Sequence, residues 1–82
     1  MREVLSYLVR ALVDHPEAVR VEEERRQDEV VFAVCVHPDD MGQVIGRQGR
    51  VAKALRSVMR ALGRREGTRV SVDIREAAPA SE

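Results

Sequence analysis

Residues 40–62 read DMGQVIGRQGRVAKALRSVMRAL, and this stretch decides the fold because two helical segments meet at the four residues GRQG. Pro38 and the two aspartates that follow it favour the start of the first segment, since Asp can cap free amides and Pro fits a first helical turn. Gly46 can end this helix in a left-handed conformation, and the helical spacing resumes directly after Gly49. The stretch therefore predicts a short helix, a tight glycine loop and a long helix.

The rest of the chain predicts one further helix and three strands. Apolar residues at helical spacing predict a helix over residues 2–14. Residues 18–24 alternate apolar and polar, residues 29–36 are almost continuously apolar, and the polar link between them favours a hairpin. Residues 68–74 alternate again and predict a last strand. The order helix, strand, strand, helix, helix, strand predicts an α+β domain with helices packed on one face of a three-stranded sheet.

The length and composition of the chain predict a single small domain. The chain has 82 residues, of which 44% are hydrophobic and 34% charged, and a chain this short supports only one core. Residues 1–76 are expected to form that core, and residues 77–82, rich in Ala, Pro and Ser, predict a disordered tail. Neither a signal-peptide pattern nor an apolar stretch long enough to span a membrane is found, so the expected location is the cytoplasm.

The chemically reactive residues do not form a pattern typical of an enzyme. The single cysteine, Cys35, lies in an apolar run and is expected to be a small buried hydrophobic residue. His15 and His37 are the only histidines, and the sequence does not predict that they cluster with other ligands. We therefore expect no catalytic residues, no metal site and no cofactor.

The formal net charge of zero conceals a strong segregation of charge along the chain. Residues 1–42 hold five Arg against ten Asp and Glu, whereas residues 43–69 hold seven Arg and one Lys against Glu66 alone. A basic block that begins at a helix N-terminus attracts phosphate, although a merely solvated helix face is an alternative. The loop lacks the Lys-Ser/Thr ending of a nucleotide-binding P-loop, which favours a chain of phosphates over a single nucleotide.

The segment VIGRQGRVAKALR resembles the I-G-x-x-G-x-x-I signature of KH domains, with Ile45, Gly46 and Gly49 at the expected positions. The resemblance departs from the signature at residue 52, an alanine, so that Val51 supplies the large aliphatic group. The predicted order of elements is similar to the type II, bacterial form of the fold. From about residue 2 to residue 75 the chain resembles the family of small bacterial RNA-binding KH proteins called KhpA or YlqC.

This resemblance implies that the loop grips the backbone of about four nucleotides of single-stranded RNA, with the bases on an aliphatic groove. It further implies a homodimer, or a heterodimer with a second KH protein similar to KhpB, and a role as a post-transcriptional regulator or RNA chaperone. The aromatic residues, Tyr7 and Phe32, are too few for a base-stacking platform, which fits this mode. The implied site has three parts: Gly46, Arg47, Gln48 and Gly49 grip the backbone, Val44 and Ile45 line the groove with one of them partly exposed, and Arg50, Lys53 and Arg56 supply positive charge.

Two other functions remain open from the sequence. A helix-turn-helix DNA-binding module also joins two helices through a turn with glycine, but residues 50–64 offer no Asn or Gln to read bases. In a protein–protein interaction adaptor, the acidic first half of one protomer would pair with the basic second half of another.

Overall fold

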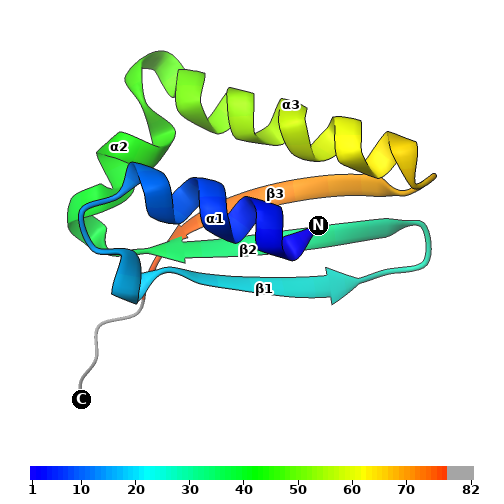
Figure 1. Ribbon diagram of the computed structural model, residues 1–82, viewed down its shortest axis with the longest axis horizontal. Helices are drawn as coiled ribbons and strands as arrows, with labels where there is room; N and C mark the ends of the chain where they lie inside the picture. Colours follow the sequence, from blue (N-terminus) through cyan, green and yellow to red (C-terminus); the bar gives the residue numbers. More distant parts are fainter. Residues whose placement is uncertain (78–82) are drawn as a thin grey trace.

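The computed structural model describes residues 1–77, which form a three-stranded sheet with three helices on one of its faces (Figure 1). Short 3₁₀ turns connect several of the elements. This order confirms the predicted α+β fold, whereas residues 78–82 of the predicted tail lie outside the described residues. The elements are α1 (Arg2–Leu12), β1 (Arg20–Arg25), β2 (Glu29–Val36), α2 (Met41–Ile45), α3 (Arg50–Arg65) and β3 (Arg69–Glu76).

The central strand of the sheet is β2, which pairs with β1 in antiparallel and with β3 in parallel orientation. An antiparallel neighbour needs only a hairpin, but a parallel neighbour needs a crossover from one end of the sheet to the other. Helices α2 and α3 make this crossover. The GRQG loop therefore lies within this crossover, between α2 and α3.

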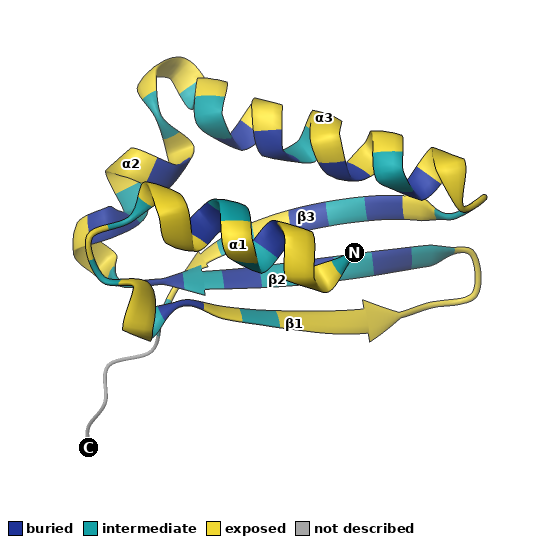
Figure 2. Cartoon of the chain, viewed as in Figure 1, coloured by how far each residue is buried: buried dark blue, intermediate teal, exposed yellow. Residues whose placement is uncertain are grey.

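The core lies between the sheet and the helices (Figure 2). Every second residue of β2 is buried, as expected for a strand with one covered face. Full burial of a side chain the size of Phe32 stabilises the fold by about 1.5–3 kcal/mol. The main contributors are Leu5 and Val9 from α1, Val30, Phe32, Val34 and Val36 from β2, Ala52, Leu55 and Met59 from α3, and Val70 and Val72 from β3.

Several details differ from the sequence-based expectation. Helix α1 ends at Leu12, two residues before its predicted end, and β3 continues to Glu76. The backbone N–H of Ala77 donates to the carbonyl of Val36 at 2.7 Å, so the first residue of the predicted tail is held to the sheet. Cys35 lies on the uncovered face of β2 and is only half-buried. Within residues 1–77, no helix has the length and apolar character needed to cross a membrane.

Candidate nucleic-acid interface

The loop that links α2 to α3 has a backbone that only glycine adopts easily at two positions. Gly46 has φ 75° and ψ 177°, and a Cβ atom placed on it would lie 2.6 Å from Cγ2 of Val51. Gly49 is left-handed, with φ 74° and ψ 17°. Gln48 between them also has a positive φ, 54°, although it carries a side chain. The sequence correctly placed a positive φ at Gly46, but ψ is extended rather than helical.

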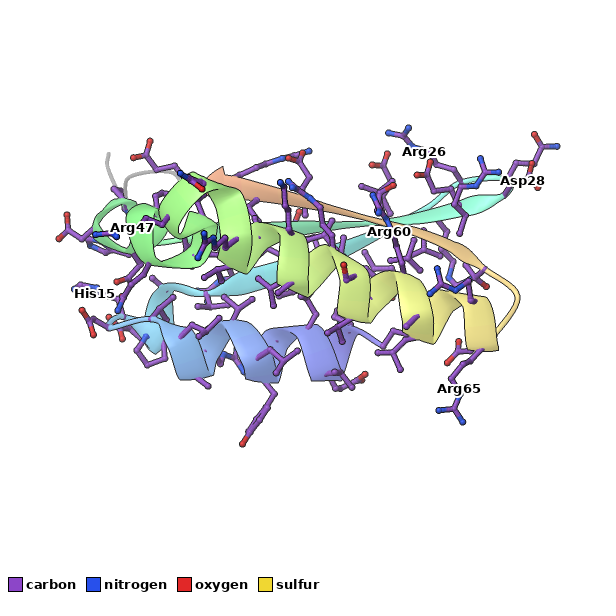
Figure 3. The ribbon with its side chains drawn as sticks, turned by 90° about the horizontal axis from the view of Figure 1, so that it is seen from above. His15, Arg26, Asp28, Arg47, Arg60 and Arg65 are labelled. Carbon is purple, nitrogen blue, oxygen red and sulfur yellow. The ribbon has the colours of Figure 1, made fainter. Side chains whose placement is uncertain are left out.

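The loop presents polar side chains next to the N-terminus of a long helix. Arg47 and Gln48 are both exposed. Gly49 is the N-cap of α3, and no side chain caps the first turn. Because the N-terminus of a helix carries a partial positive charge of about half an elementary charge, this end of α3 favours an anion. Arg47, Gln48 and the start of α3 therefore form a cationic end of the molecule, with Arg47 seen there in Figure 3.

The predicted basic residues of α3 continue from this loop: Lys53 and Arg56 lie on the side of the helix next to β3, whereas Arg50 lies on the side that faces α1. Arg50 and Lys53 are exposed. Arg56 is half-buried, and its Nε donates to the backbone carbonyl of Val72 in β3 at 3.3 Å. Since β3 is an edge strand, the basic side of α3 follows the outer edge of the sheet.

The two aliphatic residues that precede the loop have different environments. Val44 is fully buried, whereas Ile45 is 39% exposed. The expectation that only one of the two is partly exposed is confirmed. The prediction that Val44 lines the groove is wrong, because its side chain points into the core. At the position where the KH signature has a large aliphatic residue, Ala52 is buried, and Val51 packs partly against the core.

A second apolar surface is exposed between α1 and α3. It is a groove of about 370 Å³ that includes Leu8 and Leu12 of α1 and Val51, Ala54 and Val58 of α3. Leu12 and Val58 are 39% and 43% exposed. The apolar side of α3 is thus wider than the part that packs on the sheet. The part that lines this groove is not covered by any other segment within the described residues.

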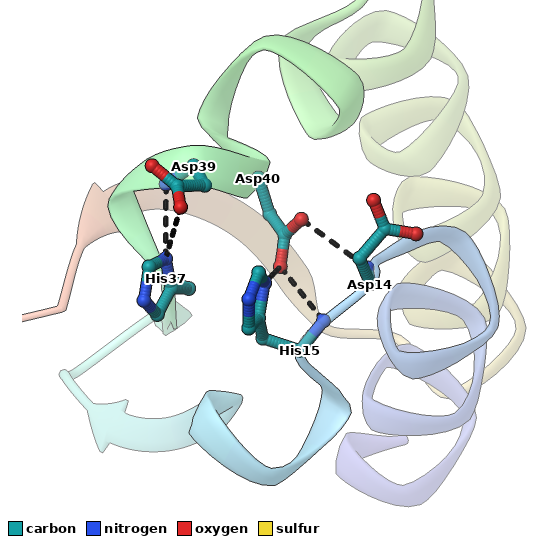
Figure 4. A network of polar contacts seen from close by, with 5 residues as sticks. All are labelled: Asp14, His15, His37, Asp39 and Asp40. Carbon is teal, nitrogen blue, oxygen red and sulfur yellow. Dashed lines mark hydrogen bonds and ion pairs between the residues drawn. The ribbon is translucent and has the colours of Figure 1, made fainter.

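The start of α2 is held by a buried carboxylate whose role the sequence did not reveal (Figure 4). Asp40 was expected to cap the short helix, but its carboxylate accepts from the backbone N–H of Asp14 at 3.2 Å and of His15 at 3.0 Å. It also contacts His15 Nδ1 at 3.1 Å. The backbone N–H of Asp39 instead donates to His37 Nδ1 at 3.0 Å. Asp40 therefore ties the base of α2 to the end of α1.

The environment of this pair shifts both of its pKa values. Burial alone raises the pKa of Asp40, but the N–H of Asp14, the ring of His15 and the N–H of His15 together lower it below its usual value. The hydrogen bond to Asp40 raises the pKa of His15, against a smaller opposite effect of desolvation. The ion pair is therefore favoured over its neutral form.

The expectation that the two histidines do not cluster is wrong. The rings of His15 and His37 stack at 4.0 Å between centroids with an angle of 14° (Figure 4), and together with Asp39 they place possible ligand atoms within 4.8 Å of one another. Imidazole lone pairs lie in the plane of the ring, so those of two nearly parallel rings run side by side rather than converge on one ion. Nδ1 of each ring is also in a hydrogen bond. We assign this cluster a structural role.

The sheet with one parallel pair and the GxxG loop between two helices place the chain in the class of KH domains. A sequence model described as the KH domain of KhpA/KhpB matches residues 2–74. The chain belongs to this KhpA/KhpB KH-domain family.

Similar proteins include three that are named RNA-binding protein KhpA. That of Halalkalibacterium halodurans is 49% identical over 74 residues, which cover 90% of this chain and 97% of the relative. That of Clostridium perfringens is 42% identical over 74 residues, covering 90% and 99%. That of Streptomyces coelicolor is 47% identical over 72 residues, covering 88% and 90%.

Solved structures of the protein Era share the fold. Aquifex aeolicus Era superimposes with a TM-score of 0.69 at 16% identity, over 96% of this chain and 31% of that chain. A second Era structure, in complex with nucleotides of 16S ribosomal RNA, gives a TM-score of 0.63 at 15% identity, over 96% of this chain and 30% of that chain. At this identity the likeness concerns the fold alone.

Proposed function

We propose that the chain binds single-stranded RNA, gripping its sugar–phosphate backbone with the GRQG loop. The observation that carries the proposal is the exposure of Arg47 and Gln48 at the uncapped N-terminus of α3. Backbone N–H groups and cationic side chains are suited to phosphate oxygens, and Ile45 offers an aliphatic surface for a base. The names of the KhpA relatives support RNA as the ligand.

A protein of this kind would act on cytoplasmic RNA as a post-transcriptional regulator or an RNA chaperone. One small KH domain makes few phosphate contacts, so weak binding is expected from a single site. Linking two weak sites raises the overall affinity without new contacts, which gives pairing of two KH domains a functional reason.

The decisive test is the double variant Arg47→Asp with Gln48→Asp, which keeps both glycines. Both positions are exposed, and exposed substitutions change stability by only about 0.5 kcal/mol, so the domain should fold. Two carboxylates would then repel an approaching phosphate. We expect binding of short single-stranded RNA, measured by fluorescence anisotropy, to fall below detection.

The matched control is Arg10→Asp with Ala11→Asp, which makes the same change in formal charge at exposed positions of α1. It should bind RNA nearly as well as the wild type. Native-like melting of the loop variant together with unchanged RNA affinity would show that the loop is only a turn. A duplex DNA competitor in the same titration tests the helix-turn-helix alternative, which requires DNA to displace the RNA.

The exposed apolar groove between α1 and α3 supports a homodimer as the functional form. Val58 lies in this groove and is 43% exposed. Val58→Glu would place a charge in a dry interface, so sedimentation should change from dimer to monomer while the melting curve stays native-like. If the wild type is a monomer by itself but pairs with a second KH protein similar to KhpB, the homodimer is rejected and a heterodimer is the functional form.

A further inference from the structure

A second cationic hollow lies at the end of the molecule opposite the GRQG loop. It has a volume of about 650 Å³ and lies where the β1–β2 hairpin meets the turn from α3 to β3. Figure 3 shows Arg47 toward one end of the molecule and Arg26 and Arg60 toward the other. The charged residues that line the hollow are Arg25, Arg26, Arg64 and Arg69, together with Asp28 and Glu29.

The arginines of this hollow are available to an anion to different degrees. Arg64 and Arg69 are exposed, and neither forms an ion pair with any residue between 1 and 77. Arg25 and Arg26 contact carboxylates of β1, Glu23 at 2.8 Å and Glu24 at 3.4 Å. Surface pairs of this kind contribute only about 0–1 kcal/mol, so they hold the two guanidinium groups weakly.

The two acidic residues of the hollow form no ion pair with its arginines within residues 1–77. The carboxylate of Glu29 accepts a hydrogen bond from the hydroxyl of Ser71, which directs it toward β3 on the uncovered face of the sheet. Asp28 lies at the tip of the hairpin, where it is exposed (Figure 3). The lining holds four guanidinium groups and two carboxylates, and Glu23 and Glu24 pair with two of the guanidiniums. The positive charge left to meet a phosphate is therefore that of Arg64 and Arg69.

A row of cations connects this hollow to the loop. Lys53, Arg56, Arg60 and Arg64 follow one another at intervals of three and four residues, so they lie along one side of α3. The hydrogen bond from Arg56 to Val72 places this side along β3. The 16 residues of α3 span about 24 Å, so the row of cations carries positive charge from the loop to the far end of the helix.

We propose that this hollow is a second phosphate-binding site, which holds nucleotides of a single-stranded RNA beyond those gripped by the GRQG loop. The ligand is the sugar–phosphate backbone of an RNA clearly longer than four nucleotides. The proposal rests on the proposed RNA-binding function, but it concerns different residues. Its distinctive consequence is a dependence on RNA length that the loop alone does not produce.

The experiment compares oligouridines of four and twelve nucleotides on the full chain and on the variant Arg64→Gln with Arg69→Gln. Both residues are exposed, so the variant should melt like the wild type. For the 12-mer we expect roughly tenfold weaker binding, and a log–log salt slope that is shallower by about 1.4 because two phosphate contacts are lost. For the 4-mer the affinity should change less than about twofold.

The control is Arg10→Gln with Arg65→Gln, which removes the same charge from residues that do not line the hollow; Arg65 projects away from Arg26 in Figure 3. It should leave the length dependence unchanged. Equal effects of the hollow variant on both RNAs, no effect on the 12-mer, or the same effect from the control would each overturn the proposal. The Arg47→Asp, Gln48→Asp variant reports on the loop separately, since it should weaken binding of both RNAs.

Discussion

Alanine at each of three glycines near the loop tests the described backbone, because the structure gives each glycine a different environment. At Gly46, φ 75° with ψ 177° is a region that side chains occupy at a cost of about 1–3 kcal/mol. The added Cβ would also lie 2.6 Å from Cγ2 and 3.0 Å from the backbone N of Val51. Overpacking of this kind adds about 1–3 kcal/mol, so Gly46→Ala should lower the free energy of unfolding by about 3 kcal/mol or more.

The other two glycines should respond differently. Gly49 is left-handed, but a Cβ atom there would have no neighbour within 4 Å, so Gly49→Ala should cost only about 1 kcal/mol. Gly42 lies within α2 and has equally open surroundings. Since alanine is favoured over glycine in a helix, Gly42→Ala should stabilise the domain by about 0.5–1 kcal/mol.

Thermal melts of the three variants provide the measurement. In a domain of this size, 1 kcal/mol corresponds to about 4–8 °C in Tm. We expect Gly42→Ala a few degrees above the wild type, Gly49→Ala a few degrees below it, and Gly46→Ala lower by well over ~10 °C. Adding Val51→Ala to Gly46→Ala should restore only part of the loss, since the contact with the backbone N remains. Equal losses at Gly46 and Gly49, or a loss at Gly42, would refute the described loop.

Three further predictions concern the site and its support. Val44→Ala should cost about 2 kcal/mol of stability because Val44 is fully buried, whereas Ile45→Ala should cost less than about 1 kcal/mol yet weaken RNA binding; chemical denaturation and RNA titration of both variants check this reversal. Because the pKa of His15 is raised, its pair with Asp40 stabilises the fold fully below the usual pKa of His, and this stability is lost as pH rises through the raised value. Because the pKa of Asp40 is lowered, acid removes the same stability only when the pH falls through that lowered value. Between pH 6 and pH 8.5, which is about two units above the usual His pKa of ~6.5, the Tm of the wild type should therefore fall more than the Tm of His15→Gln. Parallel curves of Tm against pH for the two proteins would contradict the pairing. For a tetranucleotide, about three phosphate contacts at ~0.7 each predict a log–log salt slope near −2, and a slope near zero would exclude the phosphate grip.

Much of the candidate site was predictable because its signals are local. The spacing of Gly46 and Gly49 marks the loop, and the basic residues after Gly49 follow it on one helix. The sequence predicted that one of Val44 and Ile45 is partly exposed, but it did not predict which, because both residues are aliphatic and adjacent. Which of them faces the core depends on the rotation of α2 against the sheet, and five helical residues do not define that rotation in the sequence.

The sequence by itself determined the elements of this protein, because helical spacing, strand alternation and glycine breaks each depend on neighbouring residues. The tertiary structure decided how those elements combine. Asp40 is joined to Asp14 and His15 across 26 and 25 positions of the chain, and the four arginines of the far hollow are separated by up to 44 positions. No local pattern encodes such contacts: the first arises when the end of α1 packs against the start of α2, and the second when β3 pairs in parallel with β2 and α3 crosses between them.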